Sequence, residues 1–286
     1  MKLLAALPLQ TLLLLSTLLN PTSGLQGQPP AAPRQDKGIR DNEPKRDPKY
    51  FHEPGTGDLL SHYDARYYKG QIPYAEHRPN LQHLIRSYLT VFRSLGVETW
   101  LAHGTLLGWW WNGKIMPWDY DLDVQVSNDT LTYLGENYNR TMHEYDYVDA
   151  ATGKDSKKTF LLDVNPHYLD RDRGDGQNVI DARWIDVENG MFIDITGVAE
   201  RDPEKNPGLW SCKNFHRYRT RDLYPMRETE YEGVAATVPY AFERILIEEY
   251  GTKSLVTTEW GGHKWDPALK EWVKTPEQEK VLAKTP

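Results

Sequence analysis

The sequence predicts an α/β protein in which helices and strands alternate along one domain. Three patterns predict this: an apolar helical stripe after Asn80, a strictly alternating segment at residues 119–126, and two strand-like runs joined by Asn189-Gly190. Apolar spacing of three or four residues indicates a helix, and spacing of two indicates a strand. With 286 residues and 39% hydrophobic side chains, the chain suits one sizeable core with appendages.

The N-terminal 24 residues have the composition of a secretory leader. One lysine precedes the apolar run Leu3–Leu19, and small residues follow at 22–24. This order predicts a signal peptide. Pro8 and Gln10 make the run marginal for spanning a bilayer, so cleavage is favoured, while an uncleaved leader would act as an anchor. The leader predicts that the protein works in the lumen of the secretory pathway, in the Golgi or endoplasmic reticulum, or is secreted.

Composition divides the rest of the chain into a stalk, a domain and a tail. The stretch after the leader is rich in Pro, Gly, Gln and charged residues, which is typical of disorder. The single cysteine, Cys212, excludes an intrachain disulfide, so the domain depends on its core. The predicted parts are a signal peptide at 1–24, a stalk at 25–58, a folded domain at 59–275 and a tail at 276–286.

The first predicted helix has Asn80 as its N-cap and stops at Gly96. A strand at 97–102 then runs into His103-Gly104-Thr105, and a short helix follows at 106–111. The helix before Gly96 is core scaffold, because its apolar side chains share one stripe. These side chains are Leu81, Leu84, Ile85, Tyr88, Leu89, Phe92 and Leu95.

The segment Asp119–Val126 alternates strictly between acidic or polar and apolar residues, which predicts a half-buried strand. A period of two places Asp119, Asp121 and Asp123 on one face. Leu122, Val124 and Val126 fall on the other face. One side of this strand therefore packs, and the other presents carboxylates.

Arg183–Val187 and Met191–Thr196 predict a hairpin, because the Asn-Gly turn between them suits two positive φ angles. A two-residue turn would place Asp186 opposite Ile193 and Ile185 opposite Asp194. Asp186 and Asp194 would then point to opposite sides of the sheet, so only one can join the carboxylates. A strand at 160–164 and a helix at 240–250, closed by Gly251, complete the predicted elements.

Three separate features favour phosphoryl-transfer chemistry: the Gly104-Thr105 turn, the Asp-x-Asp strand, and Asp194 between two isoleucines. Glycine lets backbone N–H groups and a helix start approach a diphosphate closely. Two carboxylates on one face suit one or two divalent cations, and a third would complete such a site. An Asp-x-Asp strand alone would more often be a solvated face, so the prediction depends on all three features together.

Several of these segments resemble the LicD family. His103–Gly108 and Gly113–Asp123 look like its signature, and stretches from Phe192 to Gly251 are similar to its later blocks in the same order. The family includes bacterial phosphocholine transferases, fukutin, fukutin-related protein, and fungal proteins associated with mannosylphosphate addition to glycans. The bulky Trp109–Trp111 is most similar to the fungal members.

The resemblance implies a nucleotidyltransferase-like fold, with a mixed sheet flanked by helices. It implies a metal-dependent phosphotransferase that moves a phospho-substituent, such as mannosyl phosphate, from a CDP- or GDP-linked donor to a glycan hydroxyl and releases a nucleoside monophosphate. Asp194 would either bind metal or receive the acceptor's proton. Tyr120 stands where many members have Asp or Asn. The implied catalytic residues are Asp121, Asp123 and Asp194, which would hold Mg²⁺ or Mn²⁺ with Asp119, and the candidate substrate-binding residues are Gly104, Thr105, His103, Lys114, Arg219 and Arg221.

Two other functions remain open from the sequence. The same motif would serve a glycosyltransferase that releases a nucleoside diphosphate, or a non-catalytic accessory protein. A net charge of −7 argues against a nucleic-acid partner, and membrane contact is expected only through an uncleaved leader. Asp163, Asp181 and Asp186 are expected at the surface or in turns, with Asp163 also a candidate for the edge of the site. Cys212 and His216 have the spacing of a zinc pair, but no second pair matches, so no zinc site is predicted.

Overall fold

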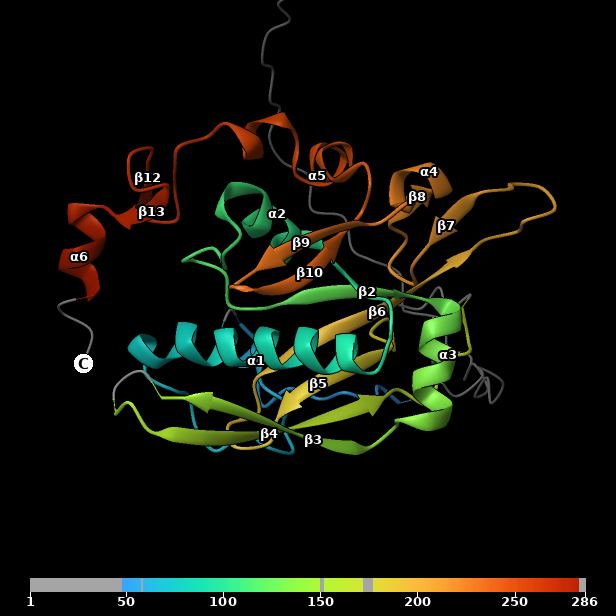
Figure 1. Ribbon diagram of the computed structural model, residues 1–286, viewed down its shortest axis with the longest axis horizontal. Helices are drawn as coiled ribbons and strands as arrows, with labels where there is room; N and C mark the ends of the chain where they lie inside the picture. The colour runs from blue at the N-terminus through green and yellow to red at the C-terminus, as the bar shows by residue number, and fades with distance from the viewer. Residues whose placement is uncertain (1–47, 58, 150–151, 172–176, 283–286) are drawn as a thin grey trace, which may run out of the picture. The chain divides into compact units, whose positions relative to one another are not determined.

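The computed structural model describes residues 48–57, 59–149, 152–171 and 177–282 (Figure 1). The predicted signal peptide and most of the predicted stalk lie outside these ranges. The elements in chain order are η1 (Leu60–His62), α1 (Tyr74–Ser94), β1 (Trp100–Leu101), α2 (His103–Asn112), β2 (Asp123–Ser127), α3 (Asn128–Asn137), β3 (Thr141–Val148), β4 (Asp155–Val164), β5 (Ala182–Asp186), β6 (Phe192–Glu200), β7 (Leu209–Ser211), β8 (Arg217–Arg219), α4 (Thr220–Leu223), β9 (Arg227–Tyr231), β10 (Val234–Val238), α5 (Phe242–Tyr250), η2 (Thr252–Leu255), β11 (Glu259–Trp260), β12 (His263–Asp266), β13 (Glu271–Lys274) and α6 (Pro276–Leu282).

A mixed sheet forms the centre of the domain, as the sequence predicts. Within the described residues it has eight strands, with the order β1-β2-β6-β5-β4-β3 and with β7 and β8 continuing from β6. β2 and β6 run parallel, and the other neighbouring pairs are antiparallel. The hairpin of β9 and β10 lies with α2 beyond the β1–β2 end of the sheet (Figure 1). The parallel pair of strands, β2 and β6, carries residues of the candidate site.

The long helix α1 packs its apolar stripe on the sheet (Figure 1). Trp184 of β5 is the central contact: its ring stacks on Phe160 and meets Tyr88 and Phe92 edge-on. The indole N–H donates to the hydroxyl of Ser87 at 2.9 Å, so this fully buried side chain has a polar partner. Apolar burial of this kind is the main source of the domain's stability.

The start of α1 differs from the predicted one. The helix begins at Tyr74 and contains Pro79, instead of starting after Asn80. Pro79 lacks the N–H that would donate to the carbonyl of Ala75 in a regular helix. The side chain of the next residue, Asn80, donates to the carbonyl of Glu76 at 2.8 Å. His77, in the added turns, is buried and packs on the ring of Tyr120. Burial of these turns therefore outweighs the helix-breaking tendency of proline.

The hairpin of β5 and β6 forms, but its register is two residues away from the predicted one. Arg183 lies opposite Asp194, and Ile185 lies opposite Phe192. The loop is longer than two residues because Asn189 donates its side chain to the carboxylate of Asp186, which shapes a wider turn. A shift of two preserves the facing of each side chain, so Asp194 and Asp186 still point to opposite sides of the sheet.

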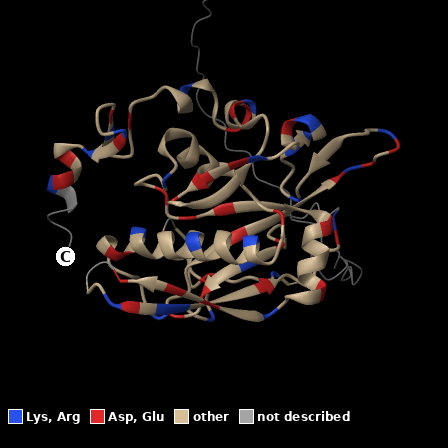
Figure 2. Cartoon of the chain, viewed as in Figure 1, with Lys and Arg blue, Asp and Glu red and all other residues tan. Residues whose placement is uncertain are grey.

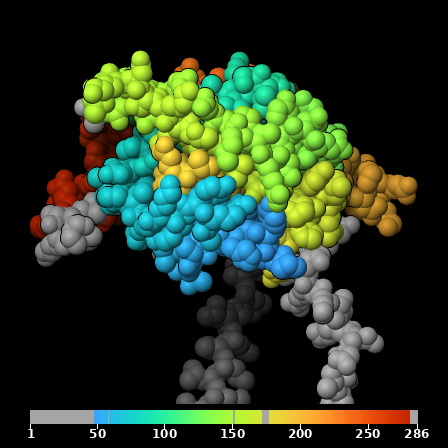
Figure 3. Space-filling model, turned by 90° about the horizontal axis from the view of Figure 1, so that it is seen from below, coloured from blue at the N-terminus to red at the C-terminus, as the bar shows by residue number. Residues whose placement is uncertain are grey.

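The domain begins before the predicted boundary at residue 59. Phe51 is buried, and Glu53 forms an ion pair with Arg183 at 2.6 Å, although both belong to the predicted stalk. The described N-terminal residues cover part of the face seen in Figure 3, where they appear in blue. At the other end, helix α6 occupies most of the predicted tail. The amino-acid composition of the predicted stalk and tail did not predict this order. The order depends on a few aromatic or charged side chains, which change the composition little.

Three carboxylates that the sequence places at the surface or in turns are instead fully buried, so that prediction is wrong. Asp163 binds Arg66 at 2.6 Å, and Asp186 binds Lys158 at 2.8 Å. Asp181 binds the equally buried Lys213 at 2.8 Å. Each buried charge has a partner, as the cost of burying it requires.

Charged side chains of both signs are interspersed over the outer elements of the fold (Figure 2). On the pair of strands β3 and β4, for example, the exposed side chain of Lys157 pairs with the exposed Glu144 at 2.8 Å. In the described part of the chain, no helix combines the length and apolarity that crossing a bilayer requires.

Candidate metal and phosphate site

The parallel pairing of β2 and β6 brings the predicted carboxylates together. Asp123 is the partner of Asp194 in this ladder, and the N–H of Asp194 donates to the carbonyl of Leu122 at 3.0 Å. Neighbouring strands lie about 4.8 Å apart, and paired residues point to the same side. Asp121 precedes β2 and lines a cavity together with Asp194. Residues from two stretches separated by about 70 positions thus share one site.

The segment before β2 is irregular, so the predicted strand begins four residues later than expected. Asp119 and Asp121 therefore reach the site from a loop, where their side chains share a hydrogen bond. A Cβ on Gly104 would lie 2.9 Å from the carboxylate of Asp119. Glycine is therefore needed at position 104 for the close approach of this loop to helix α2.

Gly104 and Thr105 lie in the first turn of α2, which starts at His103 and not at Leu106 as predicted. Thr105 is buried, and its hydroxyl accepts a hydrogen bond from the N–H of Asp123 at 2.9 Å. Thr105 is predicted to bind substrate through the backbone of this turn, and its hydroxyl fixes the backbone of the carboxylate strand. Gly104 lines the larger of the two cavities described below.

Burial, together with mutual repulsion, raises the pKa values of three carboxyl groups in this cluster. Burial, with the charges of Asp121 and Asp194, raises the pKa of Asp123 to about 8, although a charged His103 opposes the shift. Burial and the neighbouring Asp121 raise the pKa of Asp119 well above its usual range. Burial also raises the pKa of Asp194, against the effect of Arg183. Burial therefore makes it unfavourable for all of these carboxyl groups to be ionised at once in metal-free protein.

Metal-free protein is expected to lose stability between about pH 4 and pH 8 because of Asp123. Its pKa is near 3.9 in an unfolded chain and about 8 in the fold. The folded state therefore holds this proton more strongly, and its advantage disappears as the pH rises through the folded pKa. Thermal melts of wild type and Asp123→Asn after metal removal measure the effect. The variant should gain stability relative to wild type as pH rises; parallel curves would contradict the assignment.

Two cavities meet at the carboxylates. The first, here called the polar cavity, has a volume of about 350 Å³, and its walls include Glu53, Asn178 and Arg183. The second, here called the aromatic cavity, has a volume of about 590 Å³ and also contains Asp119 and Asp123. Asp121 lines both. This places the carboxylate cluster between two spaces large enough for two reactants.

The aromatic cavity has walls that the sequence did not reveal. Of the three consecutive tryptophans, Trp111 lines it, and it is joined by Trp118, Trp260 and Trp272. Lys253, in η2, supplies a cation to the same wall. Trp260, Trp272 and Lys253 come from the segment after α5, for which sequence patterns gave no geometry. The indole of Trp272 packs on those of Trp111 and Trp118.

Other predicted substrate-binding residues lie elsewhere. Lys114 forms an ion pair with Glu271. Arg219 and Arg221 belong to β8 and α4, outside the residues that line the two cavities. His103 directs Nδ1 at the carboxylate of Glu249. The Lys and Arg side chains that do line the two cavities are Lys49 and Arg183 in the polar cavity and Lys253 in the aromatic cavity.

The four carboxylates offer the ligand type that magnesium and manganese prefer. All of their ligand atoms are oxygens, which hard divalent cations prefer. Within the described ranges, Arg183 pairs with Asp194 at 2.8 Å, whereas Asp119, Asp121 and Asp123 have no ion pair with Lys or Arg. A bound cation would stabilise the ionised forms of Asp119 and Asp123, whose pKa values are raised by burial and by neighbouring carboxylates.

The chain is similar to one family model and to two yeast proteins. The family model described as LicD/FKTN/FKRP, nucleotidyltransferase domain, matches residues 96–241. Mannosyltransferase regulator 4 of Saccharomyces cerevisiae is 32% identical over 198 residues, which cover 67% of this chain and 16% of the yeast protein. Mannosyltransferase regulator 14 of the same yeast is 36% identical over 124 residues, 43% of this chain and 13% of that protein. The chain therefore spans only a small part of the length of these relatives.

Proposed function

Because the chain belongs to the LicD family, we propose that it is a metal-dependent phosphotransferase that modifies glycans. It moves a phospho-substituent, such as mannosyl phosphate, from a CDP- or GDP-linked donor to a sugar hydroxyl and releases the nucleoside monophosphate. The observation that carries the proposal is the pairing of Asp123 with Asp194 at the meeting point of two cavities. The names of the two yeast relatives support a role in mannosylation.

In this proposal Asp119, Asp121, Asp123 and Asp194 hold Mg²⁺ or Mn²⁺. The ion, when bound, neutralises charge on the donor's phosphates and on the departing nucleoside monophosphate. Thr105 keeps Asp123 in place through its backbone N–H. Gly104 leaves room for Asp119 beside the helix start, where backbone N–H groups favour an anion.

The aromatic cavity is assigned to the donor. Its four indoles offer flat apolar faces to a nucleobase or a sugar ring. Lys253 supplies positive charge for a phosphate on the same wall. Its volume of about 590 Å³ lies in the range of small-molecule sites. The polar cavity, with Asn165, Asn178 and Arg183, then receives the acceptor sugar.

Transfer needs a group that accepts the proton of the attacking hydroxyl. The acceptor oxygen bonds to phosphorus while the bond from that phosphorus to the nucleoside phosphate oxygen breaks. Asp194 lines the polar cavity, and burial raises its pKa, which favours uptake of this proton by its carboxylate. Arg183 fixes its orientation through the bond from Nε to Oδ1 at 2.8 Å.

Product analysis tests this proposal. The protein is incubated with Mn²⁺, an oligomannoside acceptor, and either a GDP- or a CDP-linked donor, and the nucleotide products are separated. Phosphoryl transfer should release GMP or CMP in step with phosphate on the glycan. Release of the nucleoside diphosphate would identify a glycosyltransferase instead, and would contradict the proposal.

A regulatory function is the second candidate, because both yeast relatives are named as regulators. In that case the domain would assist another transferase without turnover of its own. A cell carrying Asp121→Ala together with Asp123→Ala separates the two. If glycan phosphate stays normal in this cell and is lost only in a cell that lacks the protein, the regulatory function is favoured. If glycan phosphate is lost in both cells, the enzymatic function is favoured.

We also propose that the protein acts in the lumen of the secretory pathway, or after secretion. The leader-like sequence at residues 1–24 and the mannosylation named for the yeast relatives support this location. Protease protection of the epitope-tagged protein in intact membrane vesicles tests it, and digestion without detergent would contradict a lumenal site.

A further inference from the structure

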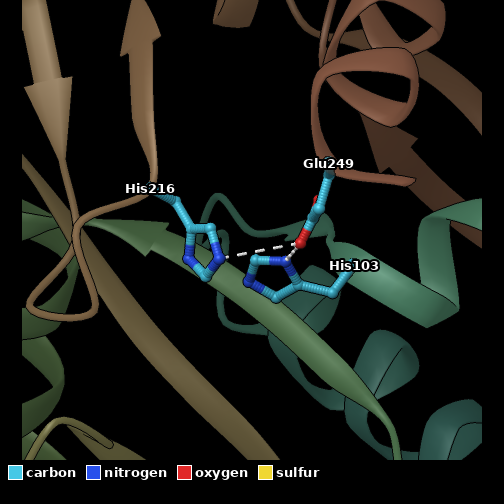
Figure 4. Close-up of side chains that lie close together, drawn as sticks. All are labelled: His103, His216 and Glu249. Atoms are coloured by element: carbon cyan, nitrogen blue, oxygen red, sulfur yellow. Dashed lines mark hydrogen bonds and ion pairs between the residues drawn. The ribbon is translucent and has the colours of Figure 1, made fainter. Parts of the chain in front are cut away.

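A second group of candidate ligands lies beside the carboxylates: His103, His216 and Glu249. They come from the start of α2, the loop between β7 and β8, and the end of α5, and they converge in Figure 4. One ligand atom from each lies within 4.8 Å of the other two. Nδ1 of His103 and Nε2 of His216 both face Oε1 of Glu249, the second at 3.7 Å. Three side chains far apart in sequence thus point at one small volume.

The surrounding backbone and side chains fix this arrangement. His103 has a φ of 51°, a left-handed conformation that is unfavourable for a residue with a side chain. Nδ1 of His216 lies 3.3 Å from Sγ of Cys212. When the proton shared in this contact resides on Nδ1, the imidazole is in the tautomer whose Nε2 has an available lone pair. This lone pair faces Glu249. Metal-binding histidines commonly have such a partner for their second nitrogen.

The group is also accessible. A cavity of about 250 Å³ has both His216 and Glu249 in its wall. The side chain of His216 is 33% exposed, and those of His103 and Glu249 are 13% and 18% exposed. An ion could therefore enter, and three protein ligands would leave one position for water or another ligand facing the cavity.

We propose that His103, His216 and Glu249 bind a zinc ion. Two imidazole nitrogens and one carboxylate are a donor set found in zinc sites, whereas magnesium and manganese favour the all-oxygen set at the aspartates. The ion would tie α2, α5 and the β7–β8 loop together next to Asp123. This site is separate from the carboxylate cluster, and it does not depend on the proposed phosphotransferase function.

Zinc affinity of the full-length protein tests the proposal. After dialysis against a chelator, ZnCl₂ is titrated in competition with a chromophoric chelator. Wild type should bind one equivalent with a dissociation constant below about 1 μM, as expected for a preformed three-ligand site. His216→Ala and Glu249→Gln should each weaken binding at least about 100-fold, because a direct ligand contributes more than the 10–100-fold typical of its supporting partners. Equal zinc affinity in wild type and these variants, or no binding by wild type, would overturn the proposal.

Two controls keep the result specific. Glu248→Gln changes the neighbouring carboxylate, which lines the same cavity and bonds to Arg244, and should retain zinc affinity. Asp121→Asn with Asp123→Asn should also retain it, and a loss there would instead assign zinc to the carboxylate cluster. Melting curves without zinc confirm folding, and added zinc should raise the melting temperature of wild type but not of His216→Ala. Cobalt substitution provides a spectroscopic check, since His216→Ala should lose the visible absorption of the bound ion.

Discussion

Asp123→Asn is expected to lower kcat/KM for phosphoryl transfer about 1,000-fold. The substitution keeps the size of the side chain and its pairing next to Asp194, but removes a charged ligand from the centre of the cluster. A catalytic metal contributes several kcal/mol to transition-state stabilisation, and about 4 kcal/mol corresponds to this factor. Initial rates of nucleoside monophosphate release, measured across donor concentrations, provide the value.

Asp146→Asn is the matched control for this measurement. Asp146 lies on β3, and its side chain is 83% exposed. The same chemical change there should leave kcat/KM within about twofold of wild type, since surface substitutions away from a site have little effect. A fall in the control as large as that of Asp123→Asn would indicate loss of folding, and an active Asp123→Asn enzyme would refute the assigned role.

Arg183→Met is expected to lower the free energy of unfolding by about 3–5 kcal/mol, the range for breaking a buried ion pair from one side. The guanidinium is 3% exposed and binds Asp194 at 2.8 Å and Glu53 at 2.6 Å. It also lies 3.6 Å above the ring of Phe192. Methionine can keep the apolar contact, but both carboxylates lose a cation. Urea unfolding, monitored by tryptophan fluorescence, measures the change.

Arg93→Met is the control for the buried pair. Arg93 bonds to Glu228 at 3.1 Å, but both side chains are mostly exposed, at 62% and 72%. Exposed pairs contribute about 0–1 kcal/mol, so this variant should unfold almost as wild type does. Equal losses in the two variants would show that Arg183 stabilises the fold only as a long side chain and not as a buried charge.

Local patterns predicted the parts of the site that lie close together in sequence. The alternation around Asp121 and Asp123 identified the carboxylate segment even though only its second half is a strand. The isolated Asp194 was assigned to the correct face because facing depends on the parity of the register, which a shift of two leaves unchanged. Such predictions succeed when the signal is contained in a few consecutive residues.

The parts of the site that could not be predicted depend on contacts between segments far apart in sequence. Such contacts leave no periodic pattern in the sequence. His103 and Glu249 are 146 positions apart, and only the packing of α2 on α5 brings them together. Cys212 and His216 lie in contact, but the spacing of this pair could not show that His216 lies beside His103 and Glu249, which come from other elements. The geometry of the aromatic cavity could not be predicted for the same reason, because Trp260 and Trp272 come from short strands after α5.

Manganese binding tests the central claim, that four aspartates from two chain segments form a divalent-cation site. The electron paramagnetic resonance signal of free Mn²⁺ is followed during titration of wild type and Asp123→Asn. The account predicts that wild type binds Mn²⁺ and that the variant binds it at least about tenfold more weakly, since a direct ligand is lost. Equal Mn²⁺ binding by the two proteins would contradict it.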